Sequence, residues 1–203
     1  MQDKYKIIDE LKLRIAERDS EALRDLYKYY YKKLKLYGLQ FSPKLISISL
    51  DDIIQNLFLW IAKNPHKLRD IENLEVYLFS ALKNNIFQEI SRNDKRKKIR
   101  NKYIKSANTN RYDSSPENKL IESEKVSDSH KFINNLLNTL PPKQREVLYL
   151  RNFLNMSYKE IGEIMNLSEQ VVRNYAHRAL QKMRKQPLTH SYKRTGKSDT
   201  FNF

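Results

Sequence analysis

Apolar residues recur at steps of three and four through the first 92 residues, and this spacing is typical of amphipathic α-helices. It predicts four helices in that part of the chain. Their apolar stripes are, in chain order, Ile7, Ile8, Leu11 and Ile15; Leu23, Leu26, Tyr27, Tyr30, Leu34 and Tyr37; Ile53, Ile54, Leu57, Phe58 and Ile61; and Val76, Phe79, Leu82, Ile86 and Ile90. We therefore expect an all-helical N-terminal domain over residues 1–92.

The expected ends of these helices carry typical capping residues. Asp19 or Ser20 can cap the second helix, because side-chain oxygens at that position accept hydrogen bonds from free backbone N–H groups. Gly38 lies where a C-terminal cap favours a left-handed residue. Ser49 can cap the third helix, which we expect to stop at residues 64–65, an Asn-Pro pair.

The pattern changes after residue 92. Basic side chains come first, and the polar segment 106–116 that follows has no sustained period. Such a segment cannot bury enough apolar surface to offset the entropy of ordering it. We expect residues 93–129 to be a flexible basic linker, which either contacts phosphates or is simply solvated. The basic residues are Arg92, Lys95, Arg96, Lys97, Lys98, Arg100, Lys102 and Lys105.

A second helical domain is expected over residues 130–186. Pro142 can occupy the first position of a helix, since a helix leaves that N–H unpaired. Residues 187–203 are mostly polar and are expected to be a loose tail. The predicted fold class is all-α, with two small helical domains joined by a flexible linker. The apolar residues that begin the second domain are Phe132, Ile133, Leu136 and Leu137.

Residues 157–184 carry the pattern of a helix-turn-helix. Ser157 can cap a short helix, and Gly162 lies where two helices must cross closely. Asn166 follows at the turn, and asparagine tolerates positive φ better than most residues. Ser168 can cap the second helix, whose inward stripe is Val172, Ala176, Ala179 and Met183. This geometry places the second helix in the major groove of DNA.

The opposite face of that second helix carries side chains suited to base recognition. Arginine can bond both acceptors of guanine, and glutamine or asparagine can bond adenine. The alternative is an ordinary helical hairpin with a solvated polar face. The residues expected to contact bases are Gln170, Arg173, Asn174, His177 and Arg178.

The composition agrees with a polyanionic partner. The formal net charge is +15 and the pI about 9.8, which favours nucleic acid but also fits acidic proteins, anionic lipid or solubility alone. With 0 cysteines there is no disulfide framework and no thiolate metal site. No apolar run approaches the roughly 18 residues of a membrane span, and no hydrophobic signal segment opens the chain. A soluble intracellular protein without a cofactor is expected.

The residues around these motifs resemble the extracytoplasmic-function (ECF) sigma factors of the sigma-70 family. The C-terminal segments resemble their region four, and the N-terminal segments resemble the polymerase-binding segment and the promoter-melting helix of their region two. Both resemblances occur in one chain and in the family's order. The segments are 140–148, 156–162, 172–173 and 177–179 for region four, and 50–58 and 77–84 for region two.

The resemblance implies partners and roles. In the family, region two binds the coiled coil of the largest subunit of core RNA polymerase and the minus-ten promoter element. Region four binds the flap of the second-largest subunit and the upstream, minus-thirty-five element. The implied polymerase-binding residues are Asp51, Asp52 and Gln55. The implied minus-ten residues are Arg69, Asn73, Tyr77, Ser80, Lys83, Asn84 and Gln88, of which Asn84 matches the family most directly.

Other roles remain open for some of these residues. The two aspartates also fit the N-terminal end of a helix, where the helix dipole favours negative charge. Tyr77 fits a stacking platform for a base and a place in the core equally well, whereas Phe79 is expected in the core. Val171 and Tyr175 depart from the threonine and the basic residue common in the family, so the promoter sequence stays open.

The expected function is that of an alternative sigma factor, a non-enzymatic subunit that directs promoter-specific transcription initiation. The expected partners are promoter DNA, core RNA polymerase and an anti-sigma factor, without a small-molecule substrate or direct membrane insertion. The expected location is the cytoplasm, on the nucleoid when active or held at the membrane by an anti-sigma factor.

The main alternative is an autonomous helix-turn-helix regulator that binds a palindromic duplex site as a dimer. An enzyme acting on nucleic acid is disfavoured, because the histidines are scattered and no paired-carboxylate motif or glycine-rich phosphate loop occurs. An RNA-binding structural protein would share the charge but needs no helix-turn-helix.

Overall fold

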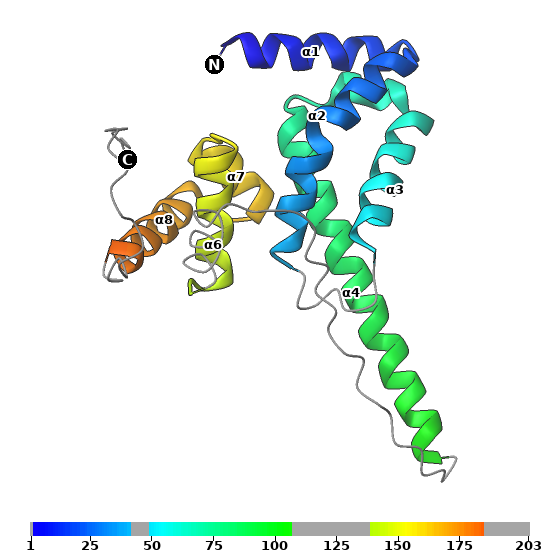
Figure 1. Ribbon diagram of the computed structural model, residues 1–203, viewed down its shortest axis with the longest axis vertical. Helices are drawn as coiled ribbons and strands as arrows, with labels where there is room; N and C mark the ends of the chain where they lie inside the picture. The colour runs from blue at the N-terminus through cyan, green and yellow to red at the C-terminus, as the bar shows by residue number, and fades with distance from the viewer. Residues whose placement is uncertain (1, 42–48, 107–138, 185–203) are drawn as a thin grey trace, which may run out of the picture.

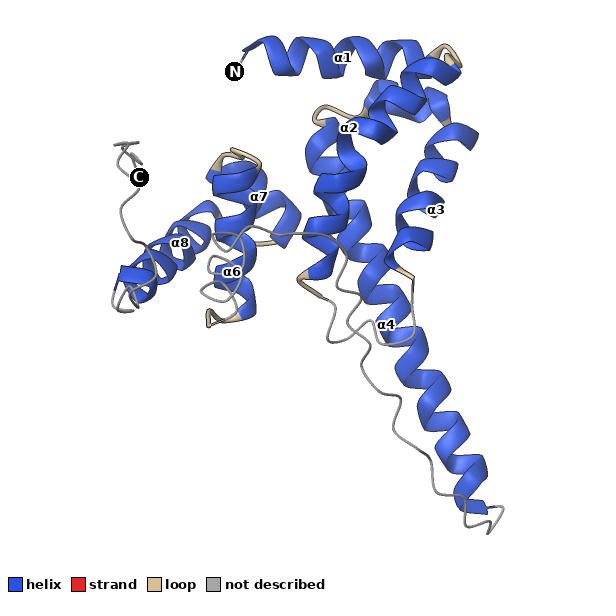
Figure 2. Ribbon diagram, in the orientation of Figure 1, coloured by secondary structure: helices blue, strands red, loops and turns tan. Residues whose placement is uncertain are grey.

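The computed structural model describes residues 2–41, 49–106 and 139–184, and all regular structure in these ranges is helical (Figures 1 and 2). The predicted all-α fold class is therefore confirmed. None of the helices in these ranges combines the length and apolar character of a membrane span. The elements are α1 (Gln2–Ala16), α2 (Ser20–Leu39), α3 (Leu50–Lys63), the 3-10 helix η2 (Pro65–Asp70), α4 (Leu74–Ser106), α6 (Pro142–Leu148), the π-helical turn η3 (Tyr149–Phe153), α7 (Tyr158–Met165) and α8 (Glu169–Arg184).

The predicted apolar stripes form the core of the N-terminal unit, α1 to α4. Leu26, Tyr30 and Leu34 of α2 are fully buried, as are Ile61 of α3 and Phe79 of α4. Burial of such side chains contributes about 25 cal/mol per Å² of apolar surface removed from water. The stripe of α1 is the exception, because its first residue, Ile7, is 59% exposed.

The helices α2 and α3 both begin with a predicted N-cap residue. The side chain of Asp19 accepts hydrogen bonds from the backbone N–H groups of Glu21 and Ala22 at the start of α2. The bond from Ala22 and the one from the Arg14 side chain hold the pKa of Asp19 below its ordinary value. Ser49 Oγ accepts from the backbone N–H of Asp52 at 3.3 Å, so Ser49 caps α3.

The prediction for Gly38 is wrong. This residue is buried inside α2, which continues to Leu39, and no glycine in the described residues has positive φ. A Cβ built on Gly38 would lie 2.5 Å from a methyl carbon of Leu50, the first residue of α3. The glycine therefore permits a close approach of α2 and α3, where the sequence pattern had indicated a helix end.

Helix α4 continues through residue 106, past residue 93, where the flexible linker was expected to begin. Figure 1 shows its C-terminal end projecting well beyond the other helices. Long unbranched side chains such as lysine and arginine lose little rotamer freedom in a helix, so this basic stretch favours helix although its side chains are mostly exposed. An ion pair between Arg92 and Glu89, three residues apart, supports the same stretch. Residues 93–106 are thus not a flexible linker.

Several predictions fall outside the described residues. The remainder of the expected linker lies there, as does the apolar segment 132–137 and the expected C-terminal tail. The predicted start of the following helix is confirmed, since α6 begins at Pro142.

The helix-turn-helix has the predicted geometry. Ser157 and Glu160 form a capping box at the start of α7, with Glu160 N–H donating to Ser157 Oγ and Ser157 N–H donating to Glu160 Oε2. Asn166 ends α7 in the left-handed conformation at φ 57°. A Cβ on Gly162 would lie 2.6 Å from the backbone oxygen of Leu167, so the turn leaves no room for a side chain there.

Candidate nucleic-acid and polymerase interface

One face of α8 is buried and the opposite face is exposed. Val172, Ala176 and Ala179 pack inward, as the spacing predicted. The five side chains expected to contact bases all lie on the exposed face, so the structure brings them together on one helix. They are Gln170, Arg173, Asn174, His177 and Arg178.

These five side chains differ in how firmly they are held. The guanidinium of Arg173 lies 4.7 Å from the ring centroid of Tyr158, and its Nε donates to Glu169 at 3.1 Å. His177 shares a 2.9 Å hydrogen bond with Gln181. No hydrogen bond, ion pair or ring contact joins Arg178 to another described residue. Among the described residues, the guanidinium of Arg173 is therefore held in place, whereas that of Arg178 is not.

The expected minus-ten residues line the start of α4 and the preceding 3-10 helix. Asn73 Oδ1 accepts from the backbone N–H of Val76, and Asn73 Nδ2 donates to Glu160 of α7 at 2.7 Å. Arg69 is exposed on η2. The ring of Tyr77 packs against Trp60 at 5.9 Å between centroids, and partial burial raises the pKa of its hydroxyl. Tyr77 is thus half core and half surface.

The polar face of α4 is only partly open to solvent. Asn84 and Gln88 are exposed and Ser80 is half-buried. Lys83 departs from the expected solvated face, because its side chain is 15% exposed and pairs with Glu146 of α6 at 2.7 Å. Phe79 is fully buried, which confirms its expected place in the core.

Glu146 has a second hydrogen-bond donor. Tyr37 Oη donates to the same carboxylate oxygen at 2.6 Å. Burial raises the pKa of Tyr37 well above its ordinary value, and the charge of Glu146 raises it further, so this hydroxyl keeps its proton and remains a donor.

The expected polymerase-binding residues at the start of α3 behave differently from one another. The Asp51 carboxylate accepts from Tyr31 Oη at 2.8 Å and from Lys35 Nζ at 3.1 Å, and these two bonds lower the pKa of Asp51. Asp51 therefore links α3 to α2. The side chains of Asp52 and Gln55 are exposed and remain open to a partner.

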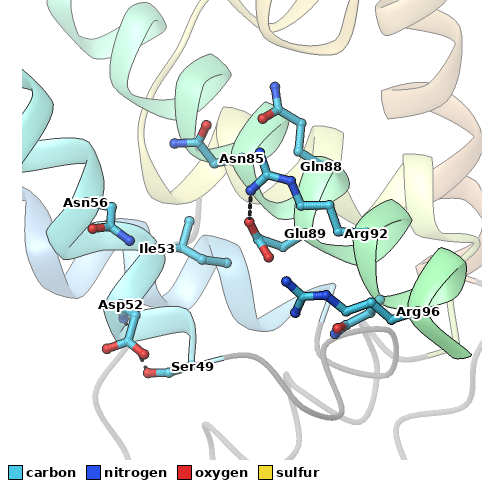
Figure 3. Close-up of a pocket in the computed structure, with 10 residues that line it drawn as sticks. Ser49, Asp52, Ile53, Asn56, Asn85, Gln88, Glu89, Arg92 and Arg96 are labelled. Carbon is cyan, nitrogen blue, oxygen red and sulfur yellow. Dashed lines mark hydrogen bonds and ion pairs between the residues drawn. The ribbon is translucent and has the colours of Figure 1, made fainter. Parts of the chain in front are cut away.

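A polar cleft of about 420 Å³ separates the N-terminal half of α3 from the middle of α4 (Figure 3). It contains one expected polymerase-binding residue, Asp52, and one expected minus-ten residue, Gln88. The sequence did not single out two other residues of the cleft, Asn56 and Asn85. It did single out Arg92 and Arg96, but only as part of the expected basic linker. Asn85, Arg92 and Arg96 lie three residues before and four and eight residues after Gln88, so helical spacing could have placed them on the face of Gln88.

Comparison with known proteins adds to this geometry. Residues 133–183 match the family model described as sigma-70, region 4. Proteins named ECF RNA polymerase sigma factor SigD, from Mycobacterium bovis and Mycobacterium tuberculosis, are 38% identical over 72 residues, which are 36% of this chain and 32% of each relative. The matched segment thus spans about a third of the length of these curated relatives.

The fold has a known counterpart. The chain resembles CnrH in its complex with the cytosolic domain of CnrY, with a TM-score of 0.53 and 18% sequence identity over 86% of this chain and 92% of that chain. At this identity the likeness shows the fold alone.

Fold and helix-turn-helix together define an all-helical class of protein in which the second helix of the motif has one exposed face. Within that class, residues 133–183 are similar to region 4 of the sigma-70 family, and the curated relatives named above are ECF sigma factors.

Proposed function

We propose that this chain is an alternative sigma factor that binds core RNA polymerase and directs transcription to specific promoters. The observation that carries the proposal is a sigma-70 region 4 match over a helix-turn-helix whose α8 presents base-recognising side chains to solvent. An autonomous regulator would need only that motif. The N-terminal unit, with its exposed acidic and amide side chains on α3 and its polar face on α4, has no role in such a regulator.

Two DNA contacts are assigned in this proposal. The exposed face of α8 recognises the upstream element through bidentate hydrogen bonds to base edges. The start of α4 and η2 capture unpaired bases of the minus-ten element, where hydrogen bonds and stacking offset the few kcal/mol of unstacking. Exposed Asn84 is the leading residue there. The proposed region two covers residues 1–92 and the proposed region four covers residues 130–186.

The polymerase contact is assigned to α3. Asp52 and Gln55 are exposed one turn apart, so both can reach the coiled coil of the largest subunit at once. Asp51 belongs to the same segment, but its carboxylate already holds Tyr31 and Lys35. The flap of the second-largest subunit would bind the proposed region four. We also propose that the protein is cytoplasmic, is not an enzyme and is controlled by an anti-sigma factor.

The polymerase contact is tested by titrating fluorescently labelled chain with core RNA polymerase. We expect the Asp52→Ala, Gln55→Ala double variant to bind core enzyme at least about tenfold more weakly, because a tenfold change corresponds to only 1.4 kcal/mol shared by two contacts. Asp9→Ala with Glu10→Ala on α1 serves as the matched control, since both residues are exposed. Unchanged affinity of the α3 variant would move the interface elsewhere.

A further inference from the structure

The cleft between α3 and α4 is lined almost entirely by polar side chains. Among the 10 described residues that line it, Ile53 alone is apolar. Its volume of about 420 Å³ lies in the range of small-molecule sites, but most such sites have largely apolar walls. The cleft therefore suits a ligand that makes many hydrogen bonds. The residues that supply a side-chain amide are Asn56, Asn85, Gln88 and Asn93.

The charged side chains of the cleft are not all neutralised. Arg92 forms an ion pair with Glu89 on the same helix. No hydrogen bond or ion pair joins the side chain of Asp52 or that of Arg96 to another described residue. Figure 3 shows Asp52 on α3 and Arg96 on α4. A carboxylate and a guanidinium that are both open to a ligand therefore belong to opposite walls of the cleft.

Guanine is the nucleic-acid base whose edges match both of these groups. Its O6 and N7 accept two hydrogen bonds from an arginine guanidinium. Its N1–H and 2-amino group are adjacent donors, and they match the two oxygens of a carboxylate. Adenine presents one acceptor and one donor where guanine presents two acceptors, and cytosine has only its 4-amino group for a carboxylate. The amides of Asn85 and Gln88 can donate or accept at the remaining polar atoms.

From this match we infer that the cleft binds a free guanine nucleotide, with Arg96 at O6 and N7 and Asp52 at N1 and the 2-amino group. The phosphate groups are attracted by the basic half of α4, which begins at the cleft. Asp52 is also one of the residues that the proposed function assigns to core polymerase. The nucleotide and core polymerase therefore compete for this carboxylate, and this part of the inference rests on the proposed function.

Binding is tested by isothermal titration calorimetry of the full chain with GDP at a fixed salt concentration. We expect saturable binding at a single site with a Kd below about 1 mM. ADP should bind at least about tenfold more weakly, because its base cannot satisfy either charged group with two hydrogen bonds. Inosine diphosphate lacks only the 2-amino group and should fall between the two. Since these nucleotides carry the same charge, the comparison separates base recognition from attraction to a chain of net charge +15.

The two walls of the cleft are tested by Arg96→Gln and Asp52→Asn. Both side chains are exposed, so neither change disturbs the core. We expect each variant to bind GDP about tenfold more weakly and to lose much of its preference over ADP, because a charged partner of the base is lost. Lys32→Gln on α2 removes the same charge as Arg96→Gln from another exposed position. It should change the GDP affinity by less than about twofold, since salt screens exposed charges outside the cleft.

Competition is tested by titrating fluorescently labelled chain with core RNA polymerase, with and without GDP. At about ten times its Kd, GDP should lower the apparent affinity of the parent chain for core enzyme about elevenfold, as strict competition requires. The same GDP concentration should have little effect on the Arg96→Gln chain. An equal fall for both chains would place the effect of GDP on the polymerase and overturn the competition.

The outcomes separate the nucleotide site from the function of the chain. Absence of GDP binding, or equal affinity for GDP and ADP, would overturn the site. GDP binding that neither Arg96→Gln nor Asp52→Asn weakens would also overturn it. GDP binding without any effect on core enzyme would overturn the competition alone. If the chain did not bind core enzyme even without GDP, the proposed function would fall, while calorimetry would still decide the nucleotide site.

Discussion

At the scale of single residues, the two arginines on the exposed face of α8 differ in how firmly other side chains hold them. Arg173 is fixed by Glu169 and by the ring of Tyr158, whereas Arg178 is unengaged among the described residues. Arg173 must exchange its bond to Glu169 for any bond to a base. Arg178 has no such bond to give up, and it is the stronger candidate for direct contact with guanine.

Replacing Arg178 with alanine should weaken binding of the upstream element by about 1–3 kcal/mol, because a bidentate contact to one base is lost. The measurement is a comparison of promoter DNA with DNA mutated base by base, at a fixed salt concentration. Arg184→Ala removes the same charge from the last turn of α8 and should weaken all sequences alike. Equal loss on every sequence for Arg178→Ala would rule out base recognition by this residue.

Gly162 offers a second test at this scale. The Cβ of an alanine would lie 2.6 Å from a backbone oxygen, so Gly162→Ala should destabilise the fold by about 1–3 kcal/mol, as overpacking does. Chemical unfolding measures the loss. Gly38→Ala meets only the methyl groups of a leucine side chain, which can move. The free energy of unfolding should fall less for Gly38→Ala than for Gly162→Ala. A larger fall for Gly38→Ala would contradict this explanation of the two glycines.

At the scale of helices, local pattern predicted what local chemistry determines. The stripes of α2 to α4, the caps at Asp19 and Ser49, and the left-handed Asn166 all depend on residues within one helix or turn. The prediction for Gly38 failed because the glycine is needed for the close approach of Leu50, which belongs to another helix. The predicted end of α4 was wrong because the loss of apolar periodicity was interpreted as the end of the helix. Charged residues with good helix propensity can continue a helix that is exposed to solvent.

The basic end of α4 leads to a prediction about salt. Lys97 and Arg100 are exposed on this helical extension, where both can contact phosphates. Replacing both with glutamine should reduce the steepness of the log–log salt dependence of duplex binding by about 0.9 per lost contact. The same charge change at exposed Lys28 and Lys32 of α2 should leave the slope nearly unaltered. Equal slopes for all three proteins would indicate that the end of α4 is merely solvated.

The residues of the candidate site could be predicted where they depend on one helix, and could not where they depend on contacts between helices. The exposed face of α8 lies on one helix, so spacing alone located all five residues. Asp51 and Lys83 were expected at open surfaces, yet each is bound by another helix, to Lys35 in one case and Glu146 in the other. These partners come from distant parts of the chain, so no pattern within α3 or α4 could predict them.

At the scale of the whole molecule, the two helical units meet as one body in this structure. The sequence predicted two domains with separate tasks and was silent on their contact. The hydrogen bonds from Tyr37 and Lys83 to Glu146, together with the shared apolar core, show that this contact is specific.

The central claim, that this chain directs polymerase to promoters, is tested most directly by transcription in vitro from a genomic DNA template. Core RNA polymerase is incubated with and without the chain, and the 5′ ends of the transcripts are mapped. We expect discrete start sites that appear only with the chain, that share an upstream sequence, and that weaken with Arg178→Ala. An unchanged set of transcripts on adding the chain, together with no affinity for core enzyme, would contradict the claim.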